Sequence, residues 1–316
     1  MNLIFTSPLR THLLKSKLLQ PVTTIIVNYN AGTLLSESVG AALDQAQEVI
    51  VVDNASKDGS MELLEANFVG QCRLKLMWLP RNQGFAVACN HGMAAATFDF
   101  LLFLNPDCLL GADSLLHMVA ALESNSAAGM AGGRLINPDG SEQGGGRRAV
   151  PTPWRSFVRA FGLNILSHRW PKLFFDFHLH EQPLPTRAIE VEAISGALML
   201  VRRSAVDDVG FWDEAYFLHC EDLDWCMRFR QREWTILFVP DAPVVHYLGH
   251  SSKTRPFFVE WHKHKGMIRF YTKFFSHQYP GVLMWLVRCG VWFRFGVLST
   301  LHAADILWGK LRTKRE

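Results

Sequence analysis

Two short acidic runs contain the residues of this sequence that are best suited to chemistry. Asn105-Pro106-Asp107 follows an apolar run, and Glu221-Asp222-Leu223-Asp224 places three carboxylates within four residues. Clustered carboxylates repel one another unless a cation or a proton is part of the site. A carboxylate that holds a divalent ion, together with one that accepts a proton, is the minimal set of groups for displacing a phosphate leaving group.

Each acidic run has a catalytic and a structural interpretation. Asp107 ends a predicted buried strand and is a candidate ligand for Mg²⁺, which proteins bind through one or two carboxylates plus substrate phosphates; the alternative is a turn aspartate. Asp222 is the candidate base that takes a proton from an attacking hydroxyl. Asp224 and Arg228 are four residues apart on a predicted helix and are expected to pair, which explains Asp224 without a catalytic role.

His246 is the second candidate metal ligand. A neutral imidazole can bind a metal ion, and a buried structural histidine is the alternative. His250 forms an H-x₃-H spacing with it, but no nearby cysteine or carboxylate completes a zinc site. Zinc is therefore not predicted.

Further residues could bind a nucleotide. Asp53 ends an apolar strand and can accept hydrogen bonds from a base or a ribose, although a turn role is the alternative. Asn82 and Gly84, with Asn90 further on, precede or begin a predicted helix, and helix N-termini favour phosphate. The alternative there is an ordinary turn between a strand and a helix.

The first hundred residues predict the scaffold for these side chains. Strand-like runs alternate with segments of helical spacing, which is typical of a parallel sheet with helices on both faces. Ligands bind at the carboxyl ends of such strands, where Asp53 and Asp107 lie. Ser60 is expected to cap the helix that follows it. The predicted strands are Val22–Asn28, Glu48–Asp53, Leu74–Leu79 and Phe98–Leu104, and the predicted helices are Leu34–Ala46, Met61–Phe68 and Gly84–Ala96.

The second half of the sequence is less regular. Gly144–Arg148 predicts a flexible loop, and the aromatic segment from there to Thr186 has no clear periodicity. Helices are expected at Ser114–Asn125 and Glu221–Arg232, and strands within Gly132–Gly140, at Val191–Val201 and at Thr235–Val239.

Composition narrows the class of protein. The chain is 49% hydrophobic and 19% charged, a low charged share that fits a large core or a membrane surface. None of the six cysteines forms a C-x-x-C pair, so a reducing cytosol fits better than a secreted disulfide framework. No convincing secretory signal is found near the N-terminus.

Positive charge gathers at the C-terminal end. Residues 255–316 contain eleven Lys or Arg and three Asp or Glu, a balance of +8 against +3 for the whole chain. The basic residues alternate with aromatic ones, which favours an anionic lipid surface over nucleic acid. Arg288 and Arg294 interrupt the apolar run Val282–Leu298, so an interfacial helix is preferred to a transmembrane one. A pair of ordinary core helices is the alternative.

Seven motifs in order give the chain a family resemblance. They resemble the family 2 glycosyltransferases of GT-A fold over about Pro21–Ser252. The Asn-Pro-Asp form and the His-x-x-Gly-x-Ser ending look most like the rhamnosyltransferase branch, which builds O-antigens and cell-wall linkers. The motifs are Thr24–Asn30, Val51–Ser60, Arg81–Phe85 with Asn90, Leu104–Asp107, Ser195–Ala197, Glu221–Asp224 with Arg228, and His246-x-x-Gly249-x-Ser251.

The resemblance implies a role for each matching residue. Asp222 would be the catalytic base, and Asp107 and His246 would bind Mg²⁺ or Mn²⁺. Many relatives have Asp-x-Asp where this chain has Asn105-x-Asp107, which implies a weaker metal site. The nucleotide-sugar would contact Asn28, Asn30, Asp53, Asn82, Gly84, Asn90 and Asn105, and the acceptor site would be formed or supported by Ser195, Gly196, Glu221, Asp224, Trp225 and Arg228.

These observations predict an α/β protein of GT-A fold with a Rossmann-like mixed sheet and a C-terminal amphipathic helical tail. Expected parts are an N-terminal extension (1–20), a nucleotide-sugar half (21–110), an acceptor and catalytic half (111–255) and a membrane-associating tail (256–316). The expected activity is inverting transfer, from dTDP-rhamnose, to a polyprenyl-diphosphate-linked glycan at the cytoplasmic face of the membrane. A sugar-nucleotide nucleotidyltransferase and a non-catalytic membrane-bound scaffold of the same fold are the alternatives.

Overall fold

The computed structural model describes residues 19–175, 177–247 and 255–312, with side chains as far as Ala304. Most of the predicted N-terminal extension, and Gly249, His250 and Ser251, lie outside these residues. The strands are β1 Gln20–Asn28, β2 Ala46–Asp53, β3 Leu74–Trp78, β4 Phe100–Leu104, β5 Cys108–Leu110, β6 Ala128–Ile136, β7 Arg147–Arg148, β8 Ile189–Glu190, β9 Ala193–Ile194, β10 Leu198–Arg202 and β11 Thr235–His246.

Helices follow most of the strands along the chain. The α-helices are α1 Leu34–Leu43, α2 Ser60–Asn67, α3 Phe85–Ala95, α4 Ser114–Glu123, α5 Pro153–Ala160, α6 Arg203–Val209, α7 Glu221–Gln231, α8 Pro256–Phe275 and α9 Val282–Arg312, and the short 3₁₀ helices are η1 Leu163–His168 and η2 Leu179–Glu181.

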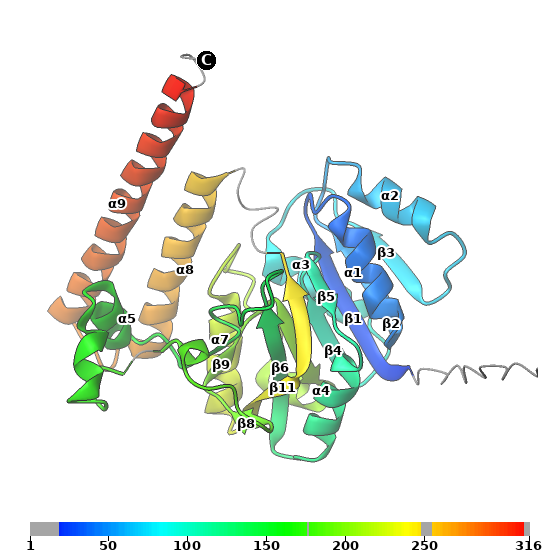
Figure 1. Cartoon of the computed structure of the whole chain (residues 1–316), viewed down its shortest axis with the longest axis horizontal. Helices are drawn as coiled ribbons and strands as arrows, with labels where there is room; N and C mark the ends of the chain where they lie inside the picture. The colour runs from blue at the N-terminus through cyan, green and yellow to red at the C-terminus, as the bar shows by residue number, and fades with distance from the viewer. Residues whose placement is uncertain (1–18, 176, 248–254, 313–316) are drawn as a thin grey trace, which may run out of the picture.

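A mixed sheet of nine strands forms the centre of the molecule (Figure 1). Its order is β3-β2-β1-β4-β10-β6-β11-β5, with β8 paired to β11. The strands β3, β2, β1 and β4 are parallel, as the alternation of strands and helices predicts. β10 enters antiparallel between β4 and β6 and makes the sheet mixed. Residues from 20 to 246 thus contribute to one sheet.

Both faces of this sheet are covered by helices. Alternate side chains of β1 enter two cores because successive residues of a strand point to opposite faces. Ile25 belongs to the core that includes Met93 of α3 and Trp225 of α7. Ile26 belongs to the core that includes Leu35 of α1 and residues of α2 and α4. Residues 22–27 are therefore all β-branched and buried, as suits a strand that is covered on both faces.

Two local predictions are wrong. Ser60 does not cap α2: Gly59 holds the N-cap position, and the Ser60 hydroxyl donates to Asp58 Oδ1 at 2.6 Å. The predicted strand Val191–Val201 is broken into β9 and β10, because the backbone turns at Ser195, where the Leu198 amide donates to the Ser195 carbonyl at 3.3 Å. That break brings Ser195 and Gly196 to the edge of a cavity.

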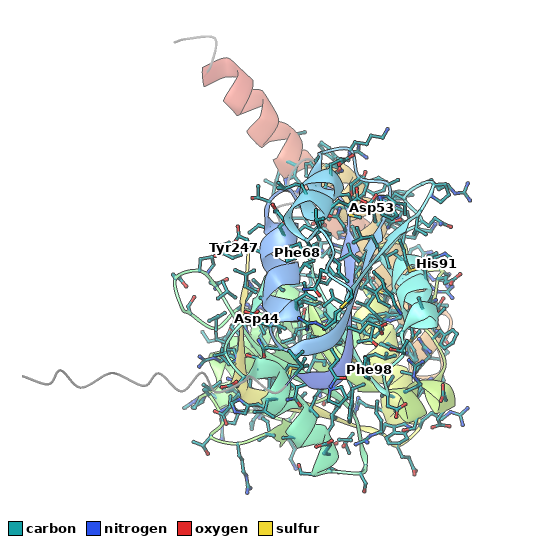
Figure 2. All side chains as sticks on the ribbon, turned by 90° about the vertical axis from the view of Figure 1, so that its right-hand side faces the viewer. Asp44, Asp53, Phe68, His91, Phe98 and Tyr247 are labelled. Carbon is teal, nitrogen blue, oxygen red and sulfur yellow. The ribbon has the colours of Figure 1, made fainter. Side chains whose placement is uncertain are left out.

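The parallel strands place their carboxyl ends at one edge. In Figure 2, Asp53 at the end of β2 and Phe98 just before β4 mark the two opposite ends of these strands. The turn after β4 lies at the same edge as Asp53, since β1 pairs in parallel with both β2 and β4. This edge carries the cavity described below.

The C-terminal helices α8 and α9 form a hairpin beside the sheet. Val282–Ala304 is long and apolar enough to cross a membrane, with a mean hydropathy of 1.4, and only 11% of it is buried, so it is not an ordinary core helix. Both of its arginines face α8: Arg288 Nη2 donates to Thr272 Oγ1 at 3.3 Å, and Arg294 Nη1 lies 3.0 Å from His264 Nε2. The opposite side of α9 is left apolar and exposed.

Candidate active site

A cavity of about 800 Å³ opens at the carboxyl edge of the sheet. It is lined by residues from the ends of β1, β4 and β11, from the Gly144–Arg148 loop and from the start of α7. The predicted site residues among them are Asn82, Gly84, Asn105, Asp107, Ser195, Gly196, Glu221, Asp222 and His246. The sheet topology therefore brings together residues that are far apart along the chain.

Asp107 and His246 meet inside this cavity. His246 ends β11 and pairs with Cys108 of β5, so the strand register places it next to Asp107. His246 Nε2 lies 3.3 Å from Asp107 Oδ1, and both side chains are about nine-tenths buried. Cys108 Sγ is also within 4.8 Å of these atoms, but Mg²⁺ and Mn²⁺ prefer oxygen ligands to thiolates, so Cys108 is not a candidate ligand for either ion.

Gln143 determines which nitrogen of His246 faces Asp107. Its side-chain amide nitrogen donates to Asn137 Oδ1 at 3.0 Å and to the His246 carbonyl at 3.3 Å. Gln143 Oε1 then accepts from His246 Nδ1 at 2.6 Å. In the neutral imidazole that carries its proton on Nδ1, the lone pair of Nε2 faces the Asp107 carboxylate. Two acceptors that face each other in a buried site fit a cation between them, and a metal-binding histidine typically donates its other ring N–H to an oxygen acceptor, as His246 does to Gln143.

Asp222 is held in a fixed orientation at the start of α7. The Gly196 amide donates to Oδ2 at 3.1 Å, and the Leu223 amide donates to Oδ1 at 2.8 Å. Arg148, from the short strand β7, forms an ion pair with Oδ2. The break between β9 and β10 thus supplies one hydrogen-bond donor, and the Gly144–Arg148 loop supplies the cation. This loop was predicted to be flexible, but its end is held by the pairing of β7 with β9.

The backbone ahead of Asp222 is strained. His219 and Cys220 both have positive φ, 68° and 70°, which costs energy in residues other than glycine. Helix α8 supports this turn: a Cβ atom on Gly266 would lie only 2.7 Å from the His219 carbonyl oxygen. The tail therefore packs directly against the turn that presents Asp222.

Glu221 lies next to Asp222 and also lines the cavity. Its side chain is buried, and Oε2 has no hydrogen-bond partner among the described residues. Burial, reinforced by the charge of Asp222, raises the pKa of Glu221 to about 8. A glutamate of this kind is protonated at neutral pH and can donate a hydrogen bond.

Three of the predicted nucleotide contacts lie just behind the cavity wall. Asp53 accepts from Asn28 Nδ2 at 2.9 Å and from the Ser56 amide at 3.0 Å. Asn30 Oδ1 accepts from the Lys57 amide at 2.8 Å. Asn28, Asn30 and Asp53 are thus joined in one network that shapes the ends of β1 and β2, and none of the three is among the lining residues.

The other predicted nucleotide contacts differ in position. Asn82 and Gly84 line the cavity, and a Cβ on Gly84 would lie 2.6 Å from the Phe217 carbonyl oxygen, so that position requires glycine. Asn105 lines it as well, with its amide bonded to the Ala197 carbonyl at 3.0 Å. Asn90 lies elsewhere and bonds Glu214 Oε1 at 2.9 Å and the Trp212 carbonyl at 3.1 Å.

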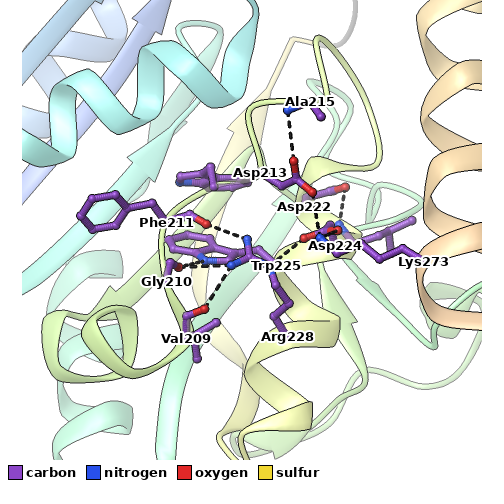
Figure 3. Close-up of polar contacts among 12 residues, drawn as sticks. Val209, Gly210, Phe211, Asp213, Ala215, Asp222, Asp224, Trp225, Arg228 and Lys273 are labelled. Carbon is purple, nitrogen blue, oxygen red and sulfur yellow. Dashed lines mark hydrogen bonds and ion pairs between the residues drawn. The ribbon is translucent and has the colours of Figure 1, made fainter.

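Asp224, Trp225 and Arg228 form a structural network behind Asp222 (Figure 3). Asp224 is fully buried and accepts from Arg228 Nε at 2.7 Å, which confirms the pair predicted from their spacing. Lys273 of α8 donates to the other oxygen of Asp224 at 2.6 Å. Trp225 Nε1 donates to the Gly210 carbonyl at 2.9 Å. These residues hold α7 in place and do not line the cavity.

Gln143 and Arg148 were not identified from the sequence as site residues. Arg148 carried a weak signal, since a cation after three glycines is suited to meeting an anion. Gln143 carried none, because its bond to His246 depends on the path of the chain between β6 and β7.

Known proteins resemble this chain in sequence. The N-acetylglucosaminyl-diphospho-decaprenol L-rhamnosyltransferase of Mycobacterium tuberculosis is 27% identical over 278 residues, which cover 84% of this chain and 88% of that protein. Rhamnosyltransferase WbbL of Escherichia coli is 29% identical over 167 residues, 52% of this chain and 58% of that protein.

Solved structures share the fold. GalNAc-T7 with UDP, GalNAc and Mn²⁺ aligns with a TM-score of 0.58 at 16% identity, over 79% of this chain and 47% of that chain. Mannosyltransferase PcManGT from Pyrobaculum calidifontis, in complex with GDP-Man and Mn²⁺, aligns with a TM-score of 0.54 at 17% identity, over 94% of this chain and 85% of that chain. These likenesses confirm the predicted GT-A fold.

The model of the family described as Glycosyl transferase family 2 matches residues 23–210, more than half of the chain. The matched region contains the carboxyl edge of the sheet, Asp107 and the Ser195-Gly196 turn. The chain belongs to glycosyl transferase family 2 and is a glycosyltransferase.

Proposed function

We propose that the protein transfers L-rhamnose from dTDP-β-L-rhamnose to a hydroxyl of a polyprenyl-diphosphate-linked glycan, with inversion at the anomeric carbon. The observation that carries the proposal is that one cavity holds both the Asp107–His246 pair and the oriented carboxylate of Asp222. The transferred sugar and the lipid-linked acceptor are supported by the relatives, one of which is an N-acetylglucosaminyl-diphospho-decaprenol L-rhamnosyltransferase.

Asp107 and His246 are suited to hold Mg²⁺ or Mn²⁺, with Gln143 orienting the imidazole. When bound, such an ion neutralises the charge that develops on a departing diphosphate. Asn105 is the neighbouring oxygen donor from the same turn, and Asn82 and Gly84 line the cavity where the nucleotide would lie. Asn28, Asn30 and Asp53 would support the base-binding end from behind.

Asp222 would act as the base. Its carboxylate takes the proton of the acceptor hydroxyl as that oxygen bonds to the anomeric carbon, while the bond from that carbon to the diphosphate oxygen breaks. The nucleoside diphosphate leaves with the bonding electron pair, and a single displacement inverts the anomeric centre. The bonds from Gly196, Leu223 and Arg148 fix the carboxylate before the acceptor arrives.

Glu221 would position the acceptor or the donor sugar. Glu221 lines the cavity, and its protonated carboxyl group can donate a hydrogen bond to a sugar hydroxyl. Its Oε2 has no partner among the described residues and is closed off from solvent, so the other oxygen is the one that faces the cavity. Ser195 and Gly196 complete this side of the cavity, and Asp224, Trp225 and Arg228 would hold α7 beneath it.

The C-terminal helices would place the protein on the inner face of the membrane. α9 exposes an apolar surface, and Arg288 and Arg294 turn toward α8. A peripheral helix of this kind would keep the cavity close to a lipid-linked acceptor.

A transfer assay tests the proposal. The purified protein is incubated with Mn²⁺, a polyprenyl-diphosphate-linked N-acetylglucosamine and, in separate reactions, dTDP-rhamnose, UDP-glucose and GDP-mannose. We expect product only in the reaction with dTDP-rhamnose, and the rhamnose in that product should have the anomeric configuration opposite to that of the donor. We also expect this donor to stabilise the protein in a thermal-shift measurement. Transfer from a UDP- or GDP-sugar at an equal rate would contradict the donor assignment.

A further inference from the structure

Residues 153–175, which we term the aromatic-basic segment, expose an unusual surface. The segment comprises α5, η1 and the residues after them, and it contains four Lys or Arg and no Asp or Glu. It lies between the Gly144–Arg148 loop and β8, outside the cavity lining. Neither the sheet nor the proposed chemistry requires its side chains.

The apolar side chains of the segment point outward. Phe157, Phe161 and Ile165 are spaced four residues apart and are 45%, 67% and 80% exposed. Phe157 and Phe161 are neighbours at the end of α5, and Ile165 follows in η1 after the left-handed turn at Gly162. Trp154, Trp170 and Leu173 are also between 42% and 58% exposed. A contiguous set of exposed apolar side chains on a folded protein marks a binding surface.

These side chains are held in place by one another. The rings of Trp154 and Phe157 stack at 5.6 Å, and those of Phe157 and Phe161 lie 4.5 Å apart. Trp154 Nε1 donates to the Leu173 carbonyl at 2.7 Å and so closes the segment on itself. The surface is therefore formed before any partner binds, which lowers the entropy cost of binding.

The cations of the segment have two different environments. Arg155 and Arg159 pair with Glu192 and Glu181. Arg169 and Lys172 are exposed, and neither forms an ion pair with a residue that the structure describes. Two free cations beside exposed tryptophans are the combination that binds lipid phosphates and the interfacial region of a bilayer.

The segment and α9 lie at the same end of the molecule. Ser156 Oγ is 2.8 Å from Tyr271 Oη, which fixes α5 on α8. α9 packs on α8 as well, with the rings of Trp261 and Trp292 5.1 Å apart. Figure 1 shows α5 beside the α8–α9 hairpin, away from the sheet. α8 thus connects the two exposed apolar surfaces.

We propose that the aromatic-basic segment is a second membrane-docking element, which binds an anionic phospholipid bilayer together with α9. A second copy of the chain is a poorer occupant, because a symmetric interface would set Arg169 and Lys172 against the same cations. Arg148, the ion-pair partner of Asp222, lies five residues before Pro153. α5 is also fixed on α8, which lines the cavity, so docking of the segment places the bilayer at a fixed position relative to the cavity. This inference does not depend on the proposed reaction, since lipid binding needs neither donor nor acceptor.

Vesicle binding by the full chain tests the proposal. The variant Phe157→Ser/Phe161→Ser/Ile165→Ser leaves α9 unchanged. We expect it to bind phosphatidylglycerol vesicles at least about tenfold more weakly than the wild type in co-sedimentation. We expect Arg169→Gln/Lys172→Gln to reduce the salt dependence of binding to the same vesicles.

The matched control is Leu63→Ser/Val69→Ser/Leu116→Ser, which removes three exposed apolar side chains from α2, the turn after it and α4, on the opposite face of the sheet from α8. It should bind vesicles like the wild type, and both triple variants should keep the thermal unfolding midpoint. Equal vesicle binding by the wild type and the segment variant would show that α9 docks alone and would overturn the proposal. The proposal also fails if the segment variant changes only the oligomeric state in sedimentation without lipid.

A fluorescent label reports directly whether the aromatic-basic segment contacts the bilayer. In a Cys72→Ser/Cys289→Ser background, which removes the exposed cysteines, an environment-sensitive fluorophore is attached at Ile165→Cys or at Val69→Cys. Anionic vesicles should shift the emission of the label at position 165 to the blue and allow quenching by spin-labelled lipid, and should leave the label at position 69 unchanged. Identical responses at both positions would exclude specific docking of the segment.

Discussion

His246 Nε2 lies 3.3 Å from Asp107 Oδ1, although the two residues come from distant parts of the chain. The approach follows from strand register: β11 runs antiparallel to β5, and His246 pairs with Cys108. Gln143 then fixes the imidazole so that its free nitrogen faces the carboxylate. The sheet sets the position of His246, and the side-chain amide of Gln143 sets the orientation of its ring. These two contributions can be tested separately.

The first prediction concerns the side-chain amide of Gln143. Gln143→Ala removes the acceptor for His246 Nδ1 while keeping both candidate metal ligands. We expect the affinity for Mn²⁺ to fall by about 10–100-fold, the usual effect of losing such a partner, measured by titration calorimetry in the presence of nucleotide. Gln231→Ala, at the exposed end of α7, is the control and should bind Mn²⁺ normally. Unchanged affinity in Gln143→Ala would separate this histidine from the metal site.

The second prediction concerns the proposed base. Asp222→Asn should lower kcat by about 10²–10⁴-fold, because the hydroxyl loses its proton acceptor, while the Kd for the nucleotide-sugar stays within a few-fold of the wild type. Arg148 also loses its ion-pair partner, so the free energy of unfolding should fall by about 1–3 kcal/mol. Asp207→Asn, exposed on α6, is the control. Full turnover by Asp222→Asn would remove Asp222 from this role.

The third prediction concerns pH. The pKa of Glu221 is raised in the folded protein from 4.5 to about 8. Between these values the folded state keeps a proton that the unfolded state has lost, so the stabilisation present below pH 4.5 is lost as the pH rises to about 8. The free energy of unfolding of the wild type, relative to Glu221→Gln, should fall by about 1 kcal/mol per pH unit in this window.

Urea unfolding at pH 5, 6, 7 and 8 measures this difference. Glu65→Gln, which changes an exposed glutamate on α2, serves as the control and should follow the wild-type pH dependence. A constant difference between wild type and Glu221→Gln across the four pH values would contradict a raised pKa at Glu221.

The fourth prediction tests the contact between α8 and the strained turn. Gly266→Ala would place a Cβ 2.7 Å from the His219 carbonyl oxygen, so the turn that presents Asp222 must move. We expect kcat to fall by about 10-fold or more, because small displacements of a catalytic group are costly. Gly290→Ala is a matched control on α9, where a Cβ meets nothing within 4 Å; it should keep the activity. Equal kcat in the two variants would show that α8 does not position the turn.

The fifth prediction concerns Lys273, which joins α8 to the core. It donates to Asp224 at 2.6 Å and to Asp213 at 2.8 Å. Burial raises the pKa of Asp213, but the hydrogen bonds from Lys273 and Arg269 outweigh it and lower the pKa to about 2. Lys273→Met should lower the free energy of unfolding by about 1–3 kcal/mol, because Asp224 is fully buried.

A double-mutant cycle with Asp224→Asn checks this pairing by chemical denaturation. The two effects should be less than additive, since each removes the same ion pair. Lys265→Met, which changes an exposed lysine of α8, should have little effect. Strict additivity would show that Lys273 and Asp224 act independently.

Sequence patterns predicted the parallel strands of the first half well. Residues 22–27 are all β-branched, and such residues favour a strand buried on both faces. The Asp224–Arg228 pair was likewise predictable, because residues four apart on a helix are neighbours regardless of tertiary structure. The break at Ser195 was not, since Ile194 and Leu198 are both apolar and the turn between them depends on pairing with β7, β4 and β6.

The sequence by itself determined the class of fold, the strand ends that carry Asp53 and Asp107, and the residue types available for binding a cation and accepting a proton. These follow from local composition and spacing. Only the tertiary structure decided that Asp107 meets His246, that Gln143 and Arg148 orient the two candidate groups, and that α8 supports the turn before Asp222. Such contacts depend on strand register and helix packing between distant segments, and no local pattern of residues encodes either one.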